Sequence, residues 1–397
     1  MINRDLYINR VKPFINQKLI KVLTGQRRVG KSYILQLLAN EIKLQNPTAN
    51  FIFIDKEKYE FDNIRNHSQL MDYININKKD EMNYLFIDEV QDIEGFERVL
   101  RSLYSEKNFD IYCTGSNAQI FSGELTTYLS GRQIVFHIGS LNFTEFCTFH
   151  KLTPDNETLL KYLKYGGLPY LIHLPDDEKT RYEYLNNINA TILYRDVINR
   201  HQIRDPRFLS DLIKFLADNI GSLFSANKIS KYLKNQQIKK NVSLILDYIS
   251  HLENAYFINK VHRSDIQGKK QFEIGEKYYF EDLGLRNSIF GFNAADIGKI
   301  IENMVYLHLR NCGYEIQIGF SENREIDFIA THNGEKSYVQ VAYLLSDNTV
   351  IEREFVNLLK IDDNYPKYVV SYDDFSAKNT YKGITHFTLL DFLLNFK

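Results

Sequence analysis

The sequence has few cysteines and no long apolar run, and both absences limit the kind of protein it encodes. The 397 residues include three cysteines, Cys113, Cys147 and Cys312, which lie far apart. They form no Cys-x-x-Cys pair and offer no disulfide framework, which favours a reducing cytosol. No stretch approaches the roughly 20 apolar residues that span a bilayer, and the N-terminus lacks the apolar segment of a signal peptide. We therefore expect a cytoplasmic protein with no membrane partner.

An excess of charge of one sign is also missing. Lysine and arginine number 49 and the acids number 50, so no global field draws the chain toward nucleic acid or an anionic membrane. Any such binding must come from a local patch. Hydrophobic residues make up 44% and charged residues 25%, proportions typical of a soluble globular protein. At roughly 150 residues per domain, the length predicts two or three domains.

Residues 1–145 predict an α/β domain with a parallel sheet. Short apolar runs rich in β-branched and aromatic residues alternate there with helical patterns. Strands that alternate with helices imply right-handed crossovers and a parallel sheet covered on both faces. The predicted elements are strands at 18–23, 50–55, 83–89, 110–115 and 133–139, and a helix at 31–44.

Three further segments follow in the predicted organisation. Residues 146–220 form a helical region. Residues 221–280 contain two helical stretches and then two strands around Gly268, the order of a winged helix. Residues 281–397 form a last α/β domain, in which a helix, three strands, a helix and a strand follow one another from about residue 300.

The first chemical motif is a glycine-rich loop between the first predicted strand and the helix after it. It matches the phosphate-binding pattern G-x-x-x-x-G-K-[ST] in full. The glycines let backbone N–H groups wrap a β-phosphate, and the start of the next helix adds further donors. Lys31 is expected to bridge the β- and γ-phosphates and Ser32 to offer its hydroxyl to Mg²⁺. The nucleotide-binding residues are Gly25, Gln26, Arg27, Arg28, Val29, Gly30, Lys31 and Ser32, with Arg27 and Arg28 facing either phosphate or solvent.

A second motif ends the predicted strand at 83–89. Its apolar residues lead into Asp88 and Glu89 at the carboxyl edge of the sheet, where such sheets bind ligands. We expect Asp88 to hold Mg²⁺ through its water shell and Glu89 to polarise the attacking water. An apolar run ending in two acids is often only a strand leaving the core. Its position after a complete phosphate loop favours the functional interpretation.

Two more residues are catalytic candidates. Asn117 follows the strand at 110–115 and is placed to contact the γ-phosphate or orient the water, although a polar turn after a strand is also an ordinary loop. Arg132 precedes the next strand. An arginine there is a candidate to offset the charge of a γ-phosphate bound by a neighbouring subunit, and a solvated surface arginine is nearly as good an interpretation. A role in a neighbouring subunit would require a homo-oligomer.

The order of these motifs resembles a family of AAA+-type ATPases of bacteria and archaea that carry an uncharacterised C-terminal domain. The resemblance covers nearly the whole chain and implies an AAA+ order for the sheet. It also implies Walker roles for Lys31, Ser32, Asp88 and Glu89. Asn117 would then be the sensor and Arg132 a finger-type candidate. The segments that carry the resemblance are residues 23–35, 84–93, 114–132, 139–146, 162–171, 193–201, 278–287, 322–330 and 338–347.

The last domain resembles the core of PD-(D/E)xK nucleases. The matching positions are Glu302 on the helix, Asp327 on the second strand and Gln340 on the third, and three oxygen ligands could hold a second Mg²⁺. The lysine of that pattern is missing, because Ala342 stands in its place, and without that cation the charge on an attacked phosphate loses its partner. The domain is therefore either degenerate or a nuclease with a displaced lysine, for which Lys336 is the nearest upstream candidate.

Three functions remain open from the sequence. The first is an ATPase in which ATP and Mg²⁺ drive a conformational change of the C-terminal domains. The second is an ATP-gated DNA-binding protein or nuclease, and the third is a nucleotide-binding switch with negligible turnover. Lysines of the winged-helix segment could contact DNA phosphates or form a solvated face. They are Lys228, Lys231, Lys234, Lys239 and Lys240.

Overall fold

The computed structural model describes residues 2–118, 129, 131–235, 240–266, 275–321, 324–345, 348–373 and 380–397. The chain divides into two compact units. The N-terminal unit comprises residues 1–139 together with 254–256, and the C-terminal unit comprises residues 140–253 and 257–397.

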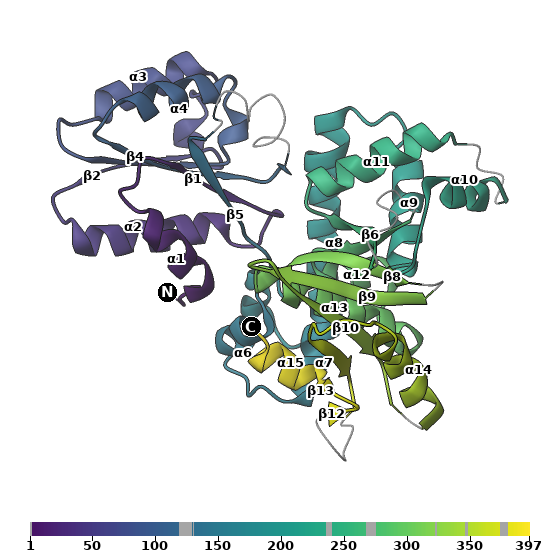
Figure 1. Cartoon of the computed structure of the whole chain (residues 1–397). Helices are drawn as coiled ribbons and strands as arrows, with labels where there is room; N and C mark the ends of the chain where they lie inside the picture. Colours follow the sequence, from purple (N-terminus) through teal and green to yellow (C-terminus); the bar gives the residue numbers. More distant parts are fainter. Residues whose placement is uncertain are drawn as a thin grey trace. The chain divides into compact units, whose positions relative to one another are not determined.

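The N-terminal unit is built around a parallel sheet of five strands in the order β2-β3-β4-β1-β5 (Figure 1). Every neighbouring pair is parallel, so all five strands end at the same edge. The parallel sheet expected of an AAA+ domain is confirmed. Its strands are β1 (Ile20–Thr24), β2 (Asn50–Asp55), β3 (Asn83–Asp88), β4 (Phe109–Gly115) and β5 (Gln133–His137).

Helices cover both faces of this sheet. In Figure 1, α1 (Asp5–Val11) and α2 (Lys31–Gln45) lie on one face, and α3 (His67–Asn77) and α4 (Phe96–Ser105) on the other. The sequence of α4 shows why it packs there. Its buried residues Phe96, Val99, Leu100 and Leu103 recur at the spacing of one helix face. They join the apolar core beneath the sheet. Short helical turns η1 (Lys12–Phe14), η2 (Tyr59–Phe61) and η3 (Val90–Asp92) complete the unit.

The strand order determines which loops meet at the carboxyl edge. The strand β4 lies between β1 and β3, and its Cα partners run from Lys21 to Thr24 on one side and from Asn83 to Ile87 on the other. The loops that follow β1, β3 and β4 therefore lie next to one another. Ligands of open parallel sheets bind at this edge, and it carries the glycine-rich loop, the two acids and Asn117.

The C-terminal unit begins with helices. A hydrogen-bonded cap starts several of them, as Asn142 does for the first, where its side chain and that of Glu145 bond each other's backbone N–H groups. A π-helical stretch, η6, continues one of these helices. The helical elements are α6 (Phe143–His150), α7 (Asn156–Tyr165), η5 (Pro169–His173), α8 (Glu178–Thr191), η6 (Ile192–Asn199), α9 (Pro206–Asp218), α10 (Ala226–Asn235), α11 (Val242–Asn254), α12 (Leu283–Phe290), η7 (Ala294–Asp296), α13 (Ile297–Asn311), α14 (Asn348–Leu359) and α15 (Leu389–Asn395).

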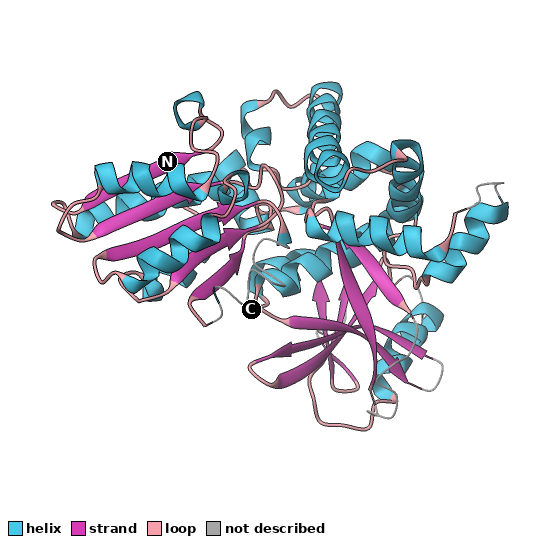
Figure 2. Cartoon of the chain, turned by 90° about the horizontal axis from the view of Figure 1, so that it is seen from above, coloured by secondary structure: helices cyan, strands magenta, loops and turns pink. Residues whose placement is uncertain are grey.

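The same unit contains a mixed sheet of eight strands in the order β12-β13-β11-β10-β9-β8-β6-β7, drawn in magenta in Figure 2. The parallel pairing of β6 with β8 joins the hairpin of the predicted winged-helix segment to the strands of the last predicted domain. Gly268 and the second strand predicted beside it lie outside the described residues. The strands are β6 (Ile258–Asp265), β7 (Glu276–Phe280), β8 (Glu315–Ser321), β9 (Arg324–His332), β10 (Glu335–Ala342), β11 (Lys367–Ser371), β12 (Thr380–Tyr381) and β13 (Ile384–Thr388).

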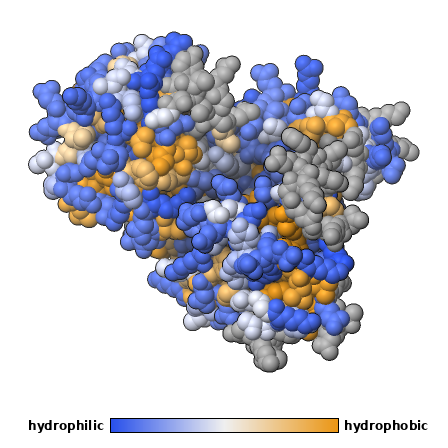
Figure 3. Space-filling model, in the orientation of Figure 1, coloured by the Kyte–Doolittle hydropathy of each residue, from blue (hydrophilic) through white to orange (hydrophobic). Residues whose placement is uncertain are grey.

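The order α13, β8, β9, β10, α14, β11 reproduces the predicted succession of helix, three strands, helix and strand. The predicted likeness to a nuclease core and to a winged helix, and the predicted domain bounds, stay predictions. Within the described ranges, no helix has both the length and the apolar character needed to cross a membrane. On the face seen in Figure 3, hydrophobic side chains reach the surface in scattered groups among hydrophilic ones.

Candidate nucleotide site

The glycine-rich loop leaves β1 at Thr24 and enters α2 at Lys31, and its two glycines adopt conformations that other residues avoid. Gly25 has φ +149°, and a Cβ there would lie 2.1 Å from the backbone oxygen of Ile138. Gly30 has φ 94° and caps the N-terminus of α2. Both positions therefore require glycine. The loop presents the first, unpaired N–H groups of α2, the feature that binds phosphate at helix N-termini.

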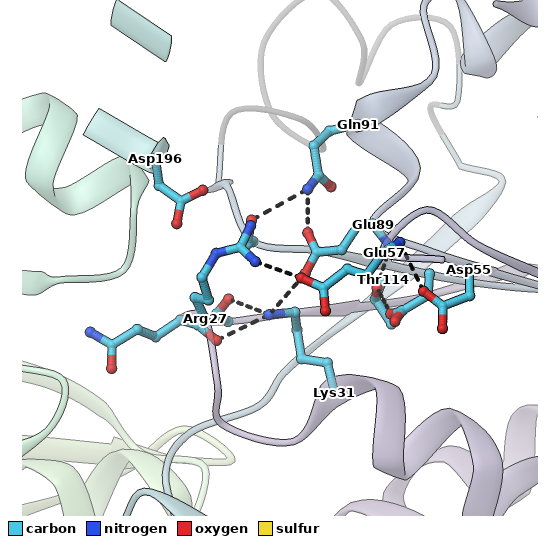
Figure 4. A network of polar contacts seen from close by, with 12 residues as sticks. Arg27, Lys31, Asp55, Glu57, Glu89, Gln91, Thr114 and Asp196 are labelled. Carbon is cyan, nitrogen blue, oxygen red and sulfur yellow. Dashed lines mark hydrogen bonds and ion pairs between the residues drawn. The ribbon is translucent and has the colours of Figure 1, made fainter. Parts of the chain in front are cut away.

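Lys31 folds over its own loop. Its ammonium donates hydrogen bonds to the carbonyl oxygens of Gly25 at 3.1 Å and Gln26 at 3.0 Å, and it lies 3.8 Å from Oε1 of Glu89. Both ionised side chains are buried, with 4% and 5% of their surfaces exposed. Figure 4 shows Lys31 and Gln91 pointing toward the Glu89 carboxylate. The Lys31 ammonium can exchange these partners, a carboxylate and two carbonyl oxygens, for a ligand of higher negative charge, because the attraction grows with that charge.

Asp88, the last residue of β3, meets oxygen atoms from two other elements. The Thr114 hydroxyl of β4 donates to Oδ1 of Asp88, and the Ser32 hydroxyl also bonds the carboxylate. Burial raises the pKa of Asp88, and the hydrogen bonds from Ser32 and Thr114 oppose that rise only in part. A hydroxyl and a carboxylate side by side form an oxygen donor set that fits Mg²⁺.

Glu89 is held in a strained conformation at the same edge. Its φ is 52°, in the left-handed region, and its backbone N–H donates to Thr114 Oγ1 at 2.8 Å. The side-chain amide of Gln91 donates to Oε2 of Glu89 and lies 3.3 Å from the Ser116 hydroxyl. Burial acts to raise the pKa of Glu89, but the charges of Lys31 and Arg27 together with hydrogen bonds from Gln91 and Ser116 outweigh it, and the pKa is lowered. Glu89 is therefore an ionised carboxylate, as a base for water must be.

The remaining loop residues take different positions. Arg27 is buried and pairs with Glu57 at 2.7 Å, whereas Arg28 is exposed, with φ 70°. Val29 is fully buried in the core. The Gln26 amide donates to the backbone oxygen of Tyr256 at 3.0 Å. Of the two arginines left open by the sequence, only Arg28 faces solvent.

The two other catalytic candidates lie at opposite edges of the sheet. Asn117 is buried just beyond the end of β4, at the same edge as the glycine-rich loop. Arg132 precedes β5, and its backbone oxygen accepts from the N–H of Ile20 at the start of β1. The length of β1 separates that edge from the loop by about 16 Å. Arg132 stacks over the ring of Tyr104, 5.6 Å from its centroid. It is therefore not brought to the nucleotide site of its own chain.

Three residues of this site escape notice in the sequence. Gln91 and Thr114 bond the two acids. The buried guanidinium of Arg4 donates to the Val29 carbonyl of the loop at 2.8 Å and to Gly139 at 3.3 Å. Arg4 and Thr114 are far from the motif along the chain, so no local pattern points to them. Gln91 lies two residues after Glu89. Its closeness to the acid pair in the sequence is the signal that could have indicated its role.

The residues of the second predicted metal site contact other side chains in the structure. Glu302 and Asp327 both lie within hydrogen-bonding distance of the Lys277 ammonium of β7, at 2.8 and 3.4 Å. Gln340 is buried on β10, where its amide lies 3.4 Å from Glu354. Lys336 lies on the exposed first part of β10. Its ammonium is 6.0 Å from the Tyr365 ring centroid. Among the described residues, no group of three or more His, Cys, Asp or Glu side chains could hold a metal ion.

The lysines proposed to contact DNA are only partly described. Lys239 lies outside the described residues, and nothing is described of the Lys228 side chain. Lys231 and Lys234 are exposed on α10, whereas Lys240 is engaged in an ion pair within its unit. DNA contact by this segment stays a prediction.

Comparisons with known proteins concern both halves of the chain. Residues 17–147 match the family model described as an AAA domain, and residues 156–296 match that of a domain of unknown function. An uncharacterized protein of Haemophilus influenzae is 34% identical, over 99% of both chains. An uncharacterized protein of Methanocaldococcus jannaschii is 32% identical, over 94% of this chain and 86% of that one. Among solved structures, the Aeropyrum pernix Orc1 protein in complex with DNA matches at 10% identity and TM-score 0.36, over 73% of this chain and 92% of that one.

Proposed function

Because this chain belongs to the same family of AAA-domain proteins as these two relatives, we propose that it binds ATP with Mg²⁺ and hydrolyses it. The observation that carries the proposal is the convergence of Lys31, Ser32, Asp88 and Glu89 at one sheet edge, beside the N-terminus of α2. Each of the four offers the group that its role requires: an ammonium, a hydroxyl, a carboxylate for the metal and a carboxylate for water.

Binding begins with an exchange of partners by Lys31. The triphosphate offers several negative charges, whereas the ammonium now has the Glu89 carboxylate at 3.8 Å and two carbonyls. The ammonium therefore moves to the phosphates, and the loop N–H groups bind the β-phosphate. Ser32 and Asp88 would hold Mg²⁺, which offsets phosphate charge when it is bound. Glu89 loses its ion pair with Lys31 in this exchange but keeps its bond to Gln91.

Hydrolysis then uses the carboxylate of Glu89. A water oxygen attacks the γ-phosphorus, the bond from that phosphorus to the bridging oxygen of ADP breaks, and Glu89 accepts a proton from the water. Asn117 contacts the γ-phosphate or orients the water. Arg132 contributes only if it comes from a neighbouring subunit, because it lies at the opposite edge of its own sheet. We propose that the nucleotide state changes the conformation of the C-terminal unit.

Two substitutions test the proposal. Lys31→Ala removes the ammonium and is expected to abolish ATP binding or turnover. Glu89→Gln keeps the shape of the side chain but cannot accept a proton, so the variant is expected to bind ATP and retain it unhydrolysed. Phosphate release and retention of labelled ATP measure the two outcomes. Full turnover in both variants would refute the proposal, and tight ATP binding with background phosphate release in the wild type would indicate a switch instead.

The competing function is an ATP-gated DNA-binding protein or nuclease. The observation that favours it is the lysine that the C-terminal unit places beside Glu302 and Asp327, although it comes from β7 and not from the position of Ala342. Incubation with plasmid, Mg²⁺ and ATP tests this function. Cleavage that is lost in Asp327→Ala would establish it, and an intact plasmid, together with ATP hydrolysis indifferent to DNA, would reject it.

A further inference from the structure

A buried lysine stands at the centre of three carboxylates in the C-terminal unit. The ammonium of Lys277, on β7, lies 2.8 Å from Glu302 Oε1, 2.6 Å from Glu325 Oε1 and 3.4 Å from Asp327 Oδ1. Only 2% of the Lys277 surface is exposed. We name these four residues the Lys277 cluster.

The carboxylates of this cluster come from elements that are distant in the sequence. Glu302 belongs to α13, and its Oε1 also accepts from the Tyr279 hydroxyl at 2.6 Å. Glu325 and Asp327 belong to β9, and the second oxygen of Asp327 accepts from the N–H of Val341 at 2.9 Å. The cluster therefore ties the β6–β7 hairpin to α13 and β9 through one ammonium.

Three carboxylate oxygens that converge on one point form the environment of a hard cation. Asp327 is buried, and Glu302 and Glu325 are half-buried. Negative charge gathered in this way needs a cation partner, because an unpaired charge away from water is unfavourable. A lysine ammonium is a compact point charge with three donors. The Lys277 ammonium donates hydrogen bonds to Glu302 and Asp327 and forms an ion pair with Glu325. In this cluster the chain itself provides the cation, and a metal ion would have to displace the buried Lys277 ammonium from its three partners to take its place.

We propose that the Lys277 cluster is a cation site filled by the protein's own ammonium, which bars divalent metal ions from it. The likeness to a nuclease core implies Mg²⁺ at Glu302 and Asp327, whereas Lys277 already occupies the space between these acids. This proposal and the competing nuclease function therefore exclude each other. Among the residues that the structure describes, the divalent-cation requirement then belongs to the nucleotide site. As they are arranged in the structure, the three carboxylates do not form a group that could hold a metal ion. A neutral residue at position 277 removes their cation and leaves them free to rearrange around a divalent one.

Manganese binding tests this proposal in the full-length chain without nucleotide. Asp88→Asn serves as the parent, so that the nucleotide site contributes as little as possible, and the loss of the signal of unbound Mn²⁺ in electron paramagnetic resonance reports binding. We expect the parent to bind no Mn²⁺ that depends on Asp327. Lys277→Ala in the parent is expected to gain about one Mn²⁺ per chain, and adding Asp327→Asn is expected to abolish that gain.

Two controls keep the outcome decisive. Lys277→Arg retains a cation and is expected to bind no additional Mn²⁺, whereas Lys277→Met removes the charge but keeps most of the stem and is expected to behave like the alanine variant. If the neutral variants unfold, Mn²⁺ should raise their melting temperatures and leave that of the parent unchanged. Binding by the parent that is lost in Asp327→Asn would overturn the proposal, and so would a folded Lys277→Ala that gains no Mn²⁺.

Discussion

At the scale of single residues, Gln91 determines where the Glu89 carboxylate points. It bonds one oxygen of Glu89 and lies 3.3 Å from the hydroxyl of Ser116. When Lys31 leaves for a phosphate, the side-chain hydrogen bonds described for that carboxylate are those from Gln91 and Ser116. A base must be oriented toward its water to act. Gln91 is therefore a positioning residue for the proposed hydrolysis.

Gln91→Leu is predicted to slow hydrolysis without weakening ATP binding. Leucine keeps the bulk of the side chain but cannot donate to Glu89, so kcat should fall about 10- to 100-fold, part of the usual contribution of a general base. Phosphate release and calorimetric titration with ATP measure the two quantities. The matched control is Gln45→Leu at the exposed end of α2, for which no change is expected. Equal losses of kcat and of affinity would argue against a positioning role.

The residues recognised from the sequence have their functional partners close by along the chain, whereas those that were missed have partners far away in the sequence. Lys31 and Ser32 belong to one contiguous loop, and Asp88 and Glu89 end one apolar strand, so local patterns indicate them. Lys277 acquires its role only when β7 pairs with β6 and α13 packs nearby. Such long-range pairing follows from tertiary packing, which a single sequence does not display. A local pattern likewise indicates Lys336, a lysine on the expected strand, whose ammonium lies 6.0 Å from the Tyr365 ring centroid in the structure.

At the scale of elements, the glycine-rich loop depends on close contact with the chain just after β5. Gly25→Ala is predicted to destabilise the N-terminal unit and to weaken ATP binding at least tenfold. The new Cβ would lie 2.1 Å from the Ile138 oxygen, and such overpacking costs about 1–3 kcal/mol. Thermal unfolding and ATP titration measure both effects.

A second alanine variant distinguishes the effect of the steric clash from the free-energy cost of a positive φ. Gly131 has φ +71°, and an added Cβ there meets nothing within 4 Å. Gly131→Ala should therefore carry only the conformational cost of about 1–2 kcal/mol, with ATP affinity unchanged. If both alanine variants bind ATP as the wild type does, the close packing of Gly25 against the Ile138 backbone is not needed for ATP binding.

Two stacked histidines tie the segment after η6 to α11. The rings of His201 and His251 lie 3.8 Å apart. Burial lowers the pKa of His201 from 6.5 to about 4, assisted by the charges of His251 and Arg200. Burial also lowers the pKa of His251, against the opposing effect of Asp247. The unfolded chain therefore binds protons more readily, and this stabilisation is present above pH 6.5 and lost as the pH falls toward 4.

Acid is accordingly predicted to destabilise the C-terminal unit through this pair. The melting temperature of the wild type should fall between pH 7 and pH 5 by on the order of 5 °C more than that of the double variant His201→Phe, His251→Phe, which keeps the ring stack without a titrating group. His173→Phe, at an exposed position, is the control and should follow the wild type. Parallel curves for the wild type and the double variant would exclude the histidine pair as the cause.

At the scale of the whole molecule, alternation of strands and helices was enough to predict the parallel sheet of the N-terminal unit. The eight-stranded sheet was not predicted as one body, because β6 pairs with β8 across a long stretch of sequence. The predicted second strand around Gly268 falls outside the described residues, and β7, which pairs with β6, begins only at Glu276. Hydrophobic patterns indicate where strands form, but not which partner each strand finds.

Both proposals assign the divalent cation to one unit of the chain. The N-terminal unit offers Ser32 and Asp88 as oxygen donors, whereas the carboxylates of the Lys277 cluster already have a cation. On these proposals the chain is an ATPase whose described residues form one divalent-cation site, and the proposed change in the C-terminal unit depends on nucleotide binding at the glycine-rich loop.

Calorimetric titration of ATP into the full-length protein in the presence of Mg²⁺ tests that dependence most directly. We predict heat that saturates at about one nucleotide per chain for the wild type, and its loss in Lys31→Ala, because the ammonium that pairs with the phosphates is removed. A wild type that releases no heat with either ATP or ADP, or a Lys31→Ala variant that binds as tightly as the wild type, would contradict it.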